Sequence, residues 1–253
     1  MPGNVYLVDA HCHLHEYSIE EINALTLSNN IVIVAVGDDL ETSNRVIEIA
    51  KTKSNILPCV GLHPWHVKSR EEGLNTAKKI IELALENNIK CIGEVGLDTK
   101  FVAETIELQR EIFKLFLEAA RDNKLVLNLH TAGTWEEVYQ LLVRYDIERA
   151  MFHWYTGPLY LLKDIEASGY MISINPAVKI QRKHKAVVEN APITIMLTES
   201  DGPYEYRGMK LNPLMVREVV GIIASIKNVD QHLVQRQIIH NLEKLFGAII
   251  NYI

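Results

Sequence analysis

The sequence has few cysteines and no long apolar run. Cys12, Cys59 and Cys91 are the only three in 253 residues, and no two form a Cys-x-x-Cys pair. Neither a disulfide framework nor a thiolate zinc site is therefore expected, and the thiols should be reduced. No apolar stretch approaches the roughly 18 residues of a membrane span, and the first residues lack a signal-peptide pattern. These absences predict a cytoplasmic protein with no membrane partner.

Positive charge is also scarce. Lysine and arginine total 26 against 32 aspartates and glutamates, which gives a formal net charge of −6. This balance argues against a broad basic surface that coats nucleic acid, although a metal ion could still bind one phosphate locally. A glycine-rich phosphate loop after the first apolar run is missing too, which disfavours a doubly wound nucleotide-binding sheet.

Short apolar runs alternate with helical segments along the whole chain. Eight runs have the length of buried parallel strands, at 5–8, 31–36, 56–60, 90–92, 125–129, 150–152, 170–174 and 193–197. Helices are expected between them from helical spacing of apolar residues, with start signals at Ser18, Thr134, Pro158, Pro213 and Asp230. Eight such units predict an α/β fold: a single (β/α)8 TIM-barrel domain over residues 1–253, with a doubly wound open sheet as the alternative.

Histidines and carboxylates follow six of the expected strands. They are His11 and His13, His63, Glu94 and Asp98, His130, His153, and finally Glu199 and Asp201. The carboxyl ends of barrel strands meet at one rim, which is where barrel enzymes perform their chemistry. One histidine at a strand end is an ordinary packing or surface residue, but the combined pattern predicts a site.

These residue types suit a centre with two divalent cations. His11 and His13 alternate on a strand, so both rings point to the same side. The expected ligands are His11, His13 and Asp201 for one cation, His130 and His153 for a second, and Glu94 as a bridge. Two cations about 3.5–4 Å apart can activate a water molecule and offset charge on the group attacked. Nitrogen-rich ligands suit Zn, Mn, Fe or Co better than Mg, and the identity of the two ions, Mg, Mn or Zn, stays open.

Blocks along the whole chain resemble the TatD-type metal-dependent deoxyribonucleases, a branch of the amidohydrolase superfamily. The matching blocks lie at 8–15 (VDAHCHLH), 60–65, 92–98, 127–133, 151–157, 169–175, 197–204, 207–213 and 241–247. The resemblance implies the same metal ligands, with Asp201 as general base, His63 orienting the scissile phosphate and Glu199 supporting Asp201 and the water. Members of the family are generally described as magnesium-dependent.

Two substrate-pocket positions depart from the family pattern. The arginine that usually follows the fifth-strand histidine is absent from the stretch His-Thr-Ala-Gly-Thr at 130–134, and the sixth-strand block reads His-Trp-Tyr-Thr-Gly. The leading hypothesis is a nuclease that hydrolyses phosphodiester bonds of DNA, or of single-stranded DNA or RNA from an end. The alternatives are an amide or ester hydrolase, such as an aminoacyl-tRNA deacylase, and a non-catalytic metal-binding barrel. We expect nucleic acid as a transient partner and a monomer or small homo-oligomer.

Overall fold

Eight parallel strands form the centre of the computed structural model, which describes residues 7–27 and 30–247. The strands are β1 (Leu7–Cys12), β2 (Ile31–Val36), β3 (Ile56–Cys59), β4 (Cys91–Asp98), β5 (Val126–Ala132), β6 (Ala150–Phe152), β7 (Met171–Ile174) and β8 (Met196–Thr198). They pair in chain order, as β1-β2-β3 and as β4-β5-β6-β7-β8. Because every neighbour is parallel, all the carboxyl ends lie on one side.

Two junctions connect these groups into a ring. A parallel bridge joins Val60 to Ile92 between β3 and β4. On the other side, the N–H of Asp201 donates to the carbonyl of His11 at 3.0 Å, and the N–H of His13 donates to the carbonyl of Gly202 at 2.9 Å. The barrel prediction is therefore confirmed, and the open doubly wound sheet is wrong.

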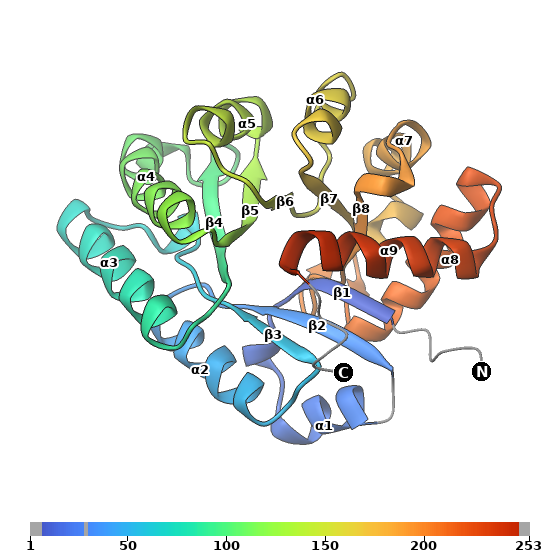
Figure 1. Cartoon of the computed structure of the whole chain (residues 1–253), viewed down its shortest axis with the longest axis horizontal. Helices are drawn as coiled ribbons and strands as arrows, with labels where there is room; N and C mark the ends of the chain where they lie inside the picture. Colours follow the sequence, from blue (N-terminus) through green and yellow to red (C-terminus); the bar gives the residue numbers. More distant parts are fainter. Residues whose placement is uncertain (1–6, 28–29, 248–253) are drawn as a thin grey trace.

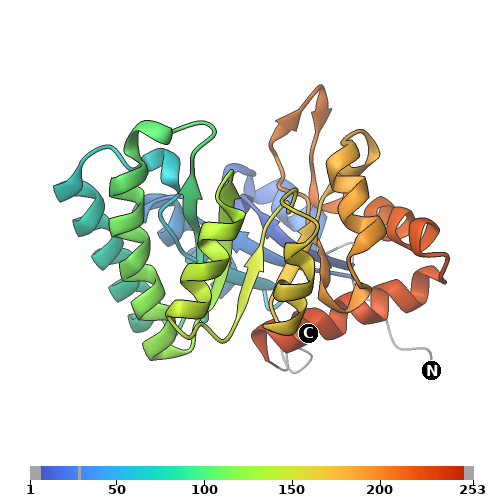
Figure 2. The ribbon, with the colours of Figure 1, turned by 90° about the horizontal axis from the view of Figure 1, so that it is seen from above.

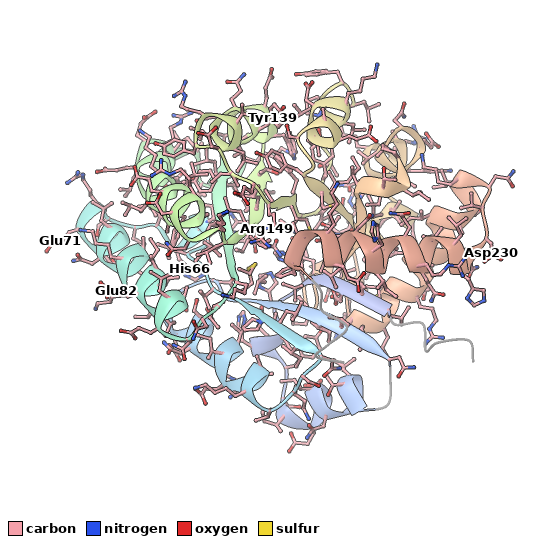
Figure 3. The ribbon with its side chains drawn as sticks, in the orientation of Figure 1. His66, Glu71, Glu82, Tyr139, Arg149 and Asp230 are labelled. Carbon is pink, nitrogen blue, oxygen red and sulfur yellow. A yellow bond between two sulfur atoms is a disulfide. The ribbon has the colours of Figure 1, made fainter. Side chains whose placement is uncertain are left out.

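Helices cover the outside of the strands (Figure 1). They are α1 (Ile19–Leu27), α2 (Leu40–Lys51), α3 (Arg70–Glu86), α4 (Ile106–Asn123), α5 (Trp135–Arg144), α6 (Leu161–Ala167), α7 (Arg182–Asn190), α8 (Val216–Lys227) and α9 (Gln231–Phe246). Each buries an apolar stripe against the strands; on α4 the stripe includes Phe113 and Phe116. Glu71 and Glu82 instead point away from α3 on the outer edge (Figure 3). Within 7–27 and 30–247, no helix is long and apolar enough to span a membrane.

Element boundaries differ from the sequence expectation in a few places. Val5 and Tyr6 of the first expected run lie outside the described residues, and β1 continues to Cys12. Ile193–Ile195 form a 3-10 turn, so β8 begins at Met196. An antiparallel hairpin of β9 (Glu205–Tyr206) and β10 (Met209–Lys210) was not expected. It projects on the side to which the strand arrows point (Figure 2).

The cysteine expectation is wrong for two of the three thiols. Cys59 ends β3 and Cys91 begins β4, and they form a disulfide across a Cα–Cα distance of 4.5 Å. Their separation of 32 residues carries no sequence signal, because only the side-by-side placement of β3 and β4 brings them together. Cys12 remains a free thiol and is buried.

Candidate metal centre and active site

The eight predicted site residues converge at the carboxyl ends of the strands. A pocket of about 450 Å³ at this rim is lined by His13, His63, Glu94, His130, His153 and Asp201. His11 and Glu199 lie beneath it and are fully buried. A volume in this range suits a small ligand or one or two units of a polymer. Strands that are far apart in the sequence thus deliver nitrogen and oxygen ligands to one place.

Glu94 occupies the middle of the cluster. Its Oε2 lies 3.3 Å from Nε2 of His11 and 3.6 Å from Nε2 of His13. Its Oε1 lies 2.7 Å from Nδ1 of His130 and 3.1 Å from Nε2 of His153. The two oxygens of one carboxylate therefore face two different pairs of imidazoles, which is the arrangement that a bridging ligand needs.

Asp201 completes the first of these groups. Its Oδ1 lies 3.5 Å from Nε2 of His11 and 3.2 Å from Nε2 of His13. The backbone of Asp201 is left-handed, with φ of 57°, which aspartate tolerates better than bulkier residues do. Because its N–H is bonded to the carbonyl of His11, the turn after β8 fixes this carboxylate against β1.

Hydrogen bonds assign the protons on the first two histidines. Nδ1 of His11 donates to Oδ1 of Asn128 at 2.9 Å, and Nδ1 of His13 donates to Oδ2 of Asp38 at 3.2 Å. In each neutral ring, Nε2 then carries the lone pair, and it points at Glu94. Outer partners that hold histidine in this tautomer are typical of metal ligands.

His130 and His153 are held from the opposite side. Nε2 of His130 donates to Oδ2 of Asp98 at 3.0 Å, which leaves its Nδ1 lone pair facing Glu94. Nδ1 of His153 lies 3.5 Å from Oε1 of Glu199, and its Nε2 faces Glu94. Glu199 also accepts hydrogen bonds from the N–H of Trp154 and the hydroxyl of Ser173. Its contacts are therefore with the His153 side of the site rather than with the carboxylate of Asp201.

His63 differs from these histidines because the nitrogen that faces Glu94 carries the proton. Its Nδ1 accepts a hydrogen bond from the N–H of Trp65 at 3.1 Å, so Nε2 carries the proton. That Nε2 lies 3.3 Å from Oε1 of Glu94 and 3.1 Å from Nδ1 of His130. Burial lowers the pKa of His63, which keeps the ring neutral. A neutral ring with its proton pointing inward suits a hydrogen-bond donor rather than a metal ligand.

The carboxylates and imidazoles shift each other's proton affinity. Burial opposes ionisation of Glu94, but the surrounding histidines, His63 first, hold its pKa well below the usual value. Burial also disfavours charge on His13, yet Asp38 and Asp201 raise its pKa well above normal. The pKa of His153 is raised in the same way, by Glu94 and Glu199, against the penalty of burial. Negative charge thus dominates the site, which favours binding of a cation.

A divalent cation fits the donor set. Nε2 of His11 is buried and has no hydrogen-bond partner, although it points at the carboxylates of Glu94 and Asp201. A lone pair that faces two carboxylates is repelled unless a cation lies between them. Groups of potential ligand atoms within 4.8 Å of one another include His11, His13 and Asp201 on one side and His11, Glu94 and His153 on the other.

Sequence reasoning missed three residues that hold the histidines. Asp38 follows β2, where the strand-end rule could have found it. Asn128 stands two positions before His130 on β5, so strand alternation places both side chains on the same face. Asp98 was noted at the end of β4 but received no role. Their contacts with the ligands cross between strands, so the pairings themselves carry no local signal.

A closed barrel with buried imidazoles and carboxylates at its catalytic rim is the architecture of a metal-dependent hydrolase. Residues 8–247 match the TatD-related DNase family, and the chain belongs to that family. It is 32% identical over 249 residues to an uncharacterised metal-dependent hydrolase of Methanocaldococcus jannaschii, covering 96% of this chain and 98% of the relative. It is 25% identical to the human deoxyribonuclease TATDN3, with 96% of each chain covered.

A solved structure supports the fold independently. The crystal structure of a TatD homologue from Escherichia coli K12 superposes with a TM-score of 0.84 at 21% identity, over 96% of this chain and 98% of that one. At this identity the likeness concerns the fold alone. The family assignment, with a relative that is itself named a metal-dependent hydrolase, identifies the protein as a metal-dependent hydrolase.

Proposed function

We propose that this protein hydrolyses phosphodiester bonds of nucleic acid with the help of two divalent cations. The observation that carries the proposal is the position of Glu94, whose two oxygens face separate pairs of histidines. One cation would be held by His11, His13, Asp201 and Glu94, and the other by His130, His153 and Glu94. When bound, such cations supply an activated water and offset the charge that develops on the phosphate.

Asp201 and His63 would act on the reacting atoms directly. Asp201 is an ionisable carboxylate at the pocket wall beside His13, where it can accept the proton of the attacking water. His63 also lines the pocket and carries its proton on Nε2, which can donate to a phosphate oxygen. Glu199 acts indirectly in this proposal, because its contacts position His153.

The rim suits single-stranded nucleic acid. Two groups of aromatic rings line the pocket: Trp65 packs against Phe101, and Trp154 packs against Tyr204 and Tyr206. Exposed aromatic rings can stack on unpaired bases with little dependence on sequence. The human relative is named a deoxyribonuclease, which supports DNA as the first substrate to test. A cytoplasmic location and a monomeric or small oligomeric state stay predictions from the sequence.

The metal follows from the ligand chemistry. Four imidazoles and two carboxylates favour Mn or Zn, while Mg prefers a set richer in oxygen. We propose Mn or Zn as the tighter-bound ion and Mg as a weaker activator. Elemental analysis after dialysis against each ion measures the preference.

A panel of substrates tests the reaction type. Wild-type protein loaded with Mg, Mn or Zn should shorten labelled single-stranded DNA, and a chelator should stop the reaction. Matched reactions would contain labelled RNA, bis(p-nitrophenyl) phosphate and an aminoacyl ester. Cleavage of the ester alone would assign the protein to acyl hydrolysis, and cleavage of nothing would leave the metal a structural role.

A further inference from the structure

The pocket contains a single fixed positive charge. Among the described residues that line it, Lys100 is the only lysine or arginine. Glu16, Asp38, Glu94 and Asp201 line the same pocket. A nucleic acid that enters carries a phosphate on each side of the one being cleaved, and those phosphates lie beyond the metal ligands. Lys100 is therefore the residue in this pocket that can meet a neighbouring phosphate by charge.

The loop that carries Lys100 is fixed to the metal site. Oδ1 of Asp98 accepts hydrogen bonds from the N–H of Lys100 at 2.7 Å and of Phe101 at 2.9 Å. The other oxygen of Asp98 bonds to Nε2 of His130 at 3.0 Å and to the indole N–H of Trp65 at 2.6 Å. One carboxylate thus holds a metal-facing histidine, an aromatic ring and the backbone of Lys100 in a fixed relationship.

The side chain of Lys100 lies across the start of the next loop. Its Nζ lies 4.5 Å from the centre of the Trp135 ring. Gly133 makes this path possible, because a Cβ there would come within 3.3 Å of Cγ of Lys100 and 2.5 Å of Oγ1 of Thr99. The ion pairs within residues 7–27 and 30–247 do not include Lys100, so the indole orients its ammonium without neutralising it.

Two aromatic rings lie beside this charge. Trp65 and Phe101 form an edge-to-face pair with centroids 5.6 Å apart. They are 47% and 67% exposed, so water covers much of the apolar surface they present. Phe101 directly follows Lys100 in the same loop. The ammonium group of Lys100 can bind a phosphate, and the exposed aromatic rings beside it can stack on a base, so together they complement the phosphate and the base of one nucleotide.

We propose that the loop between β4 and α4 forms a binding subsite for the nucleotide one phosphate beyond the cleaved bond, in which Lys100 binds the phosphate next to the cleaved one and Phe101 with Trp65 stacks on the base that follows it. The proposal rests on the nuclease function. It makes Lys100 a determinant of substrate length, because a substrate with only one phosphate cannot use this contact.

Two short substrates test the phosphate contact. The ratio of kcat/KM for the trinucleotide TpTpT to that for the dinucleotide TpT measures the benefit of a second phosphate. Lys100→Met should lower this ratio about 10-fold, as loss of a charged hydrogen bond does. Lys100→Arg should keep most of it. Lys185→Met is the matched control, since it removes an exposed lysine of α7 that does not line the pocket, and it should leave the ratio unchanged.

Salt dependence gives a second readout. On a longer single-stranded DNA, the slope of log kcat/KM against log salt concentration should become less steep by about 0.7 in Lys100→Met, the value for one lost phosphate contact. An unchanged length ratio and slope in Lys100→Met, or equal losses in Lys185→Met, would overturn the subsite. If the wild type cleaves no phosphodiester at all, the nuclease function fails and the subsite with it.

A separate variant tests the stacking of the base on Phe101. Phe101→Ala should lower kcat/KM for TpTpT at least about 5-fold relative to TpT, because base stacking on an aromatic ring is lost. Phe101→Tyr should retain the effect. Leu159→Ala removes another exposed apolar side chain outside the pocket and is the control. An equal response of both substrates to Phe101→Ala would show that Phe101 does not bind the nucleotide beyond the second phosphate.

Discussion

Oδ1 of Asn128 accepts the Nδ1–H of His11 at 2.9 Å, and this contact leaves Nε2 of the same ring bare in a buried position. The amide of Asn128 also donates to the carbonyl of Ala10, so its orientation is fixed from two sides. Asn128, which stands two residues before the expected ligand His130, thus determines which nitrogen of His11 carries the proton. The metal-binding form of His11 is prepared by the fold before any cation arrives.

Replacing Asn128 should weaken cation binding. Asn128→Leu keeps the approximate volume but removes the acceptor, so His11 is free to adopt the wrong tautomer. Metal affinity should fall about 10- to 100-fold, as for other residues that orient ligands. Titration calorimetry with Mn or Zn measures the loss. Asn128→Asp keeps the acceptor for His11 but loses the donor to the carbonyl of Ala10, so it should recover part of the affinity; equal losses in both variants would show that the acceptor does not matter.

His63→Ala should separate substrate contact from metal binding. Because Nε2 of His63 carries the proton, the residue should donate to the substrate and leave the metal content nearly unchanged. The turnover number should fall about 100-fold, the usual effect of losing one donor to a developing charge. His66→Ala, a change in the same turn, should have a much smaller effect. Loss of metal in His63→Ala would place this histidine among the ligands.

Metal binding should strengthen as pH rises. Burial opposes a positive charge on His13, His130 and His153, but neighbouring carboxylates raise the pKa of each above its usual value. Protons therefore occupy these rings at neutral and lower pH and must leave before a cation binds. Apparent affinity should be low at about pH 6 and should increase as the pH is raised above about 6.5, the usual pKa of histidine. A competition assay with a chromogenic chelator measures it; affinity that is flat over this range would contradict the account.

Gly96→Ala should destabilise the fold beneath the site. The backbone of Gly96 has φ of 149°, and an added Cβ would lie 2.0 Å from the carbonyl oxygen of His130, so β4 and β5 would have to separate. The free energy of unfolding should fall by about 1–3 kcal/mol or more, the cost of overpacking. Urea unfolding checks this. Gly208→Ala also has a positive φ but meets nothing within 4 Å, so it should cost less.

The sequence predicts the barrel well because strand and helix periods are local. The runs at 31–36 and 150–152 match β2 and β6 to the residue. The strand-end rule also brings His11, Glu94 and Asp201 together, because parallel strands share one carboxyl edge. The roles of these residues in binding and catalysis stay predictions, since they concern ligands and reactions.

The features that the sequence did not predict depend on contacts between residues that are far apart in the chain. The partner of Cys59 is decided by which strand lies beside β3, and composition cannot supply that. The tautomer of His63 is decided by the N–H of Trp65, which forms part of a turn. The position of Lys100 depends on the absence of a side chain at Gly133 in the following loop. None of these features could be predicted from the sequence, because the spacing of the residues along the chain is the same whether or not the contact forms.

Titration of metal-free protein with Mn tests the central claim most directly. Cleavage of end-labelled single-stranded DNA should be absent without metal and should rise to a plateau at two equivalents. Asp201→Asn should bind metal less tightly and, when saturated, turn over about 10²–10⁴-fold more slowly, as expected for loss of a general base. Cleavage that does not depend on metal, or a fully loaded wild type no faster than Asp201→Asn, would contradict the account.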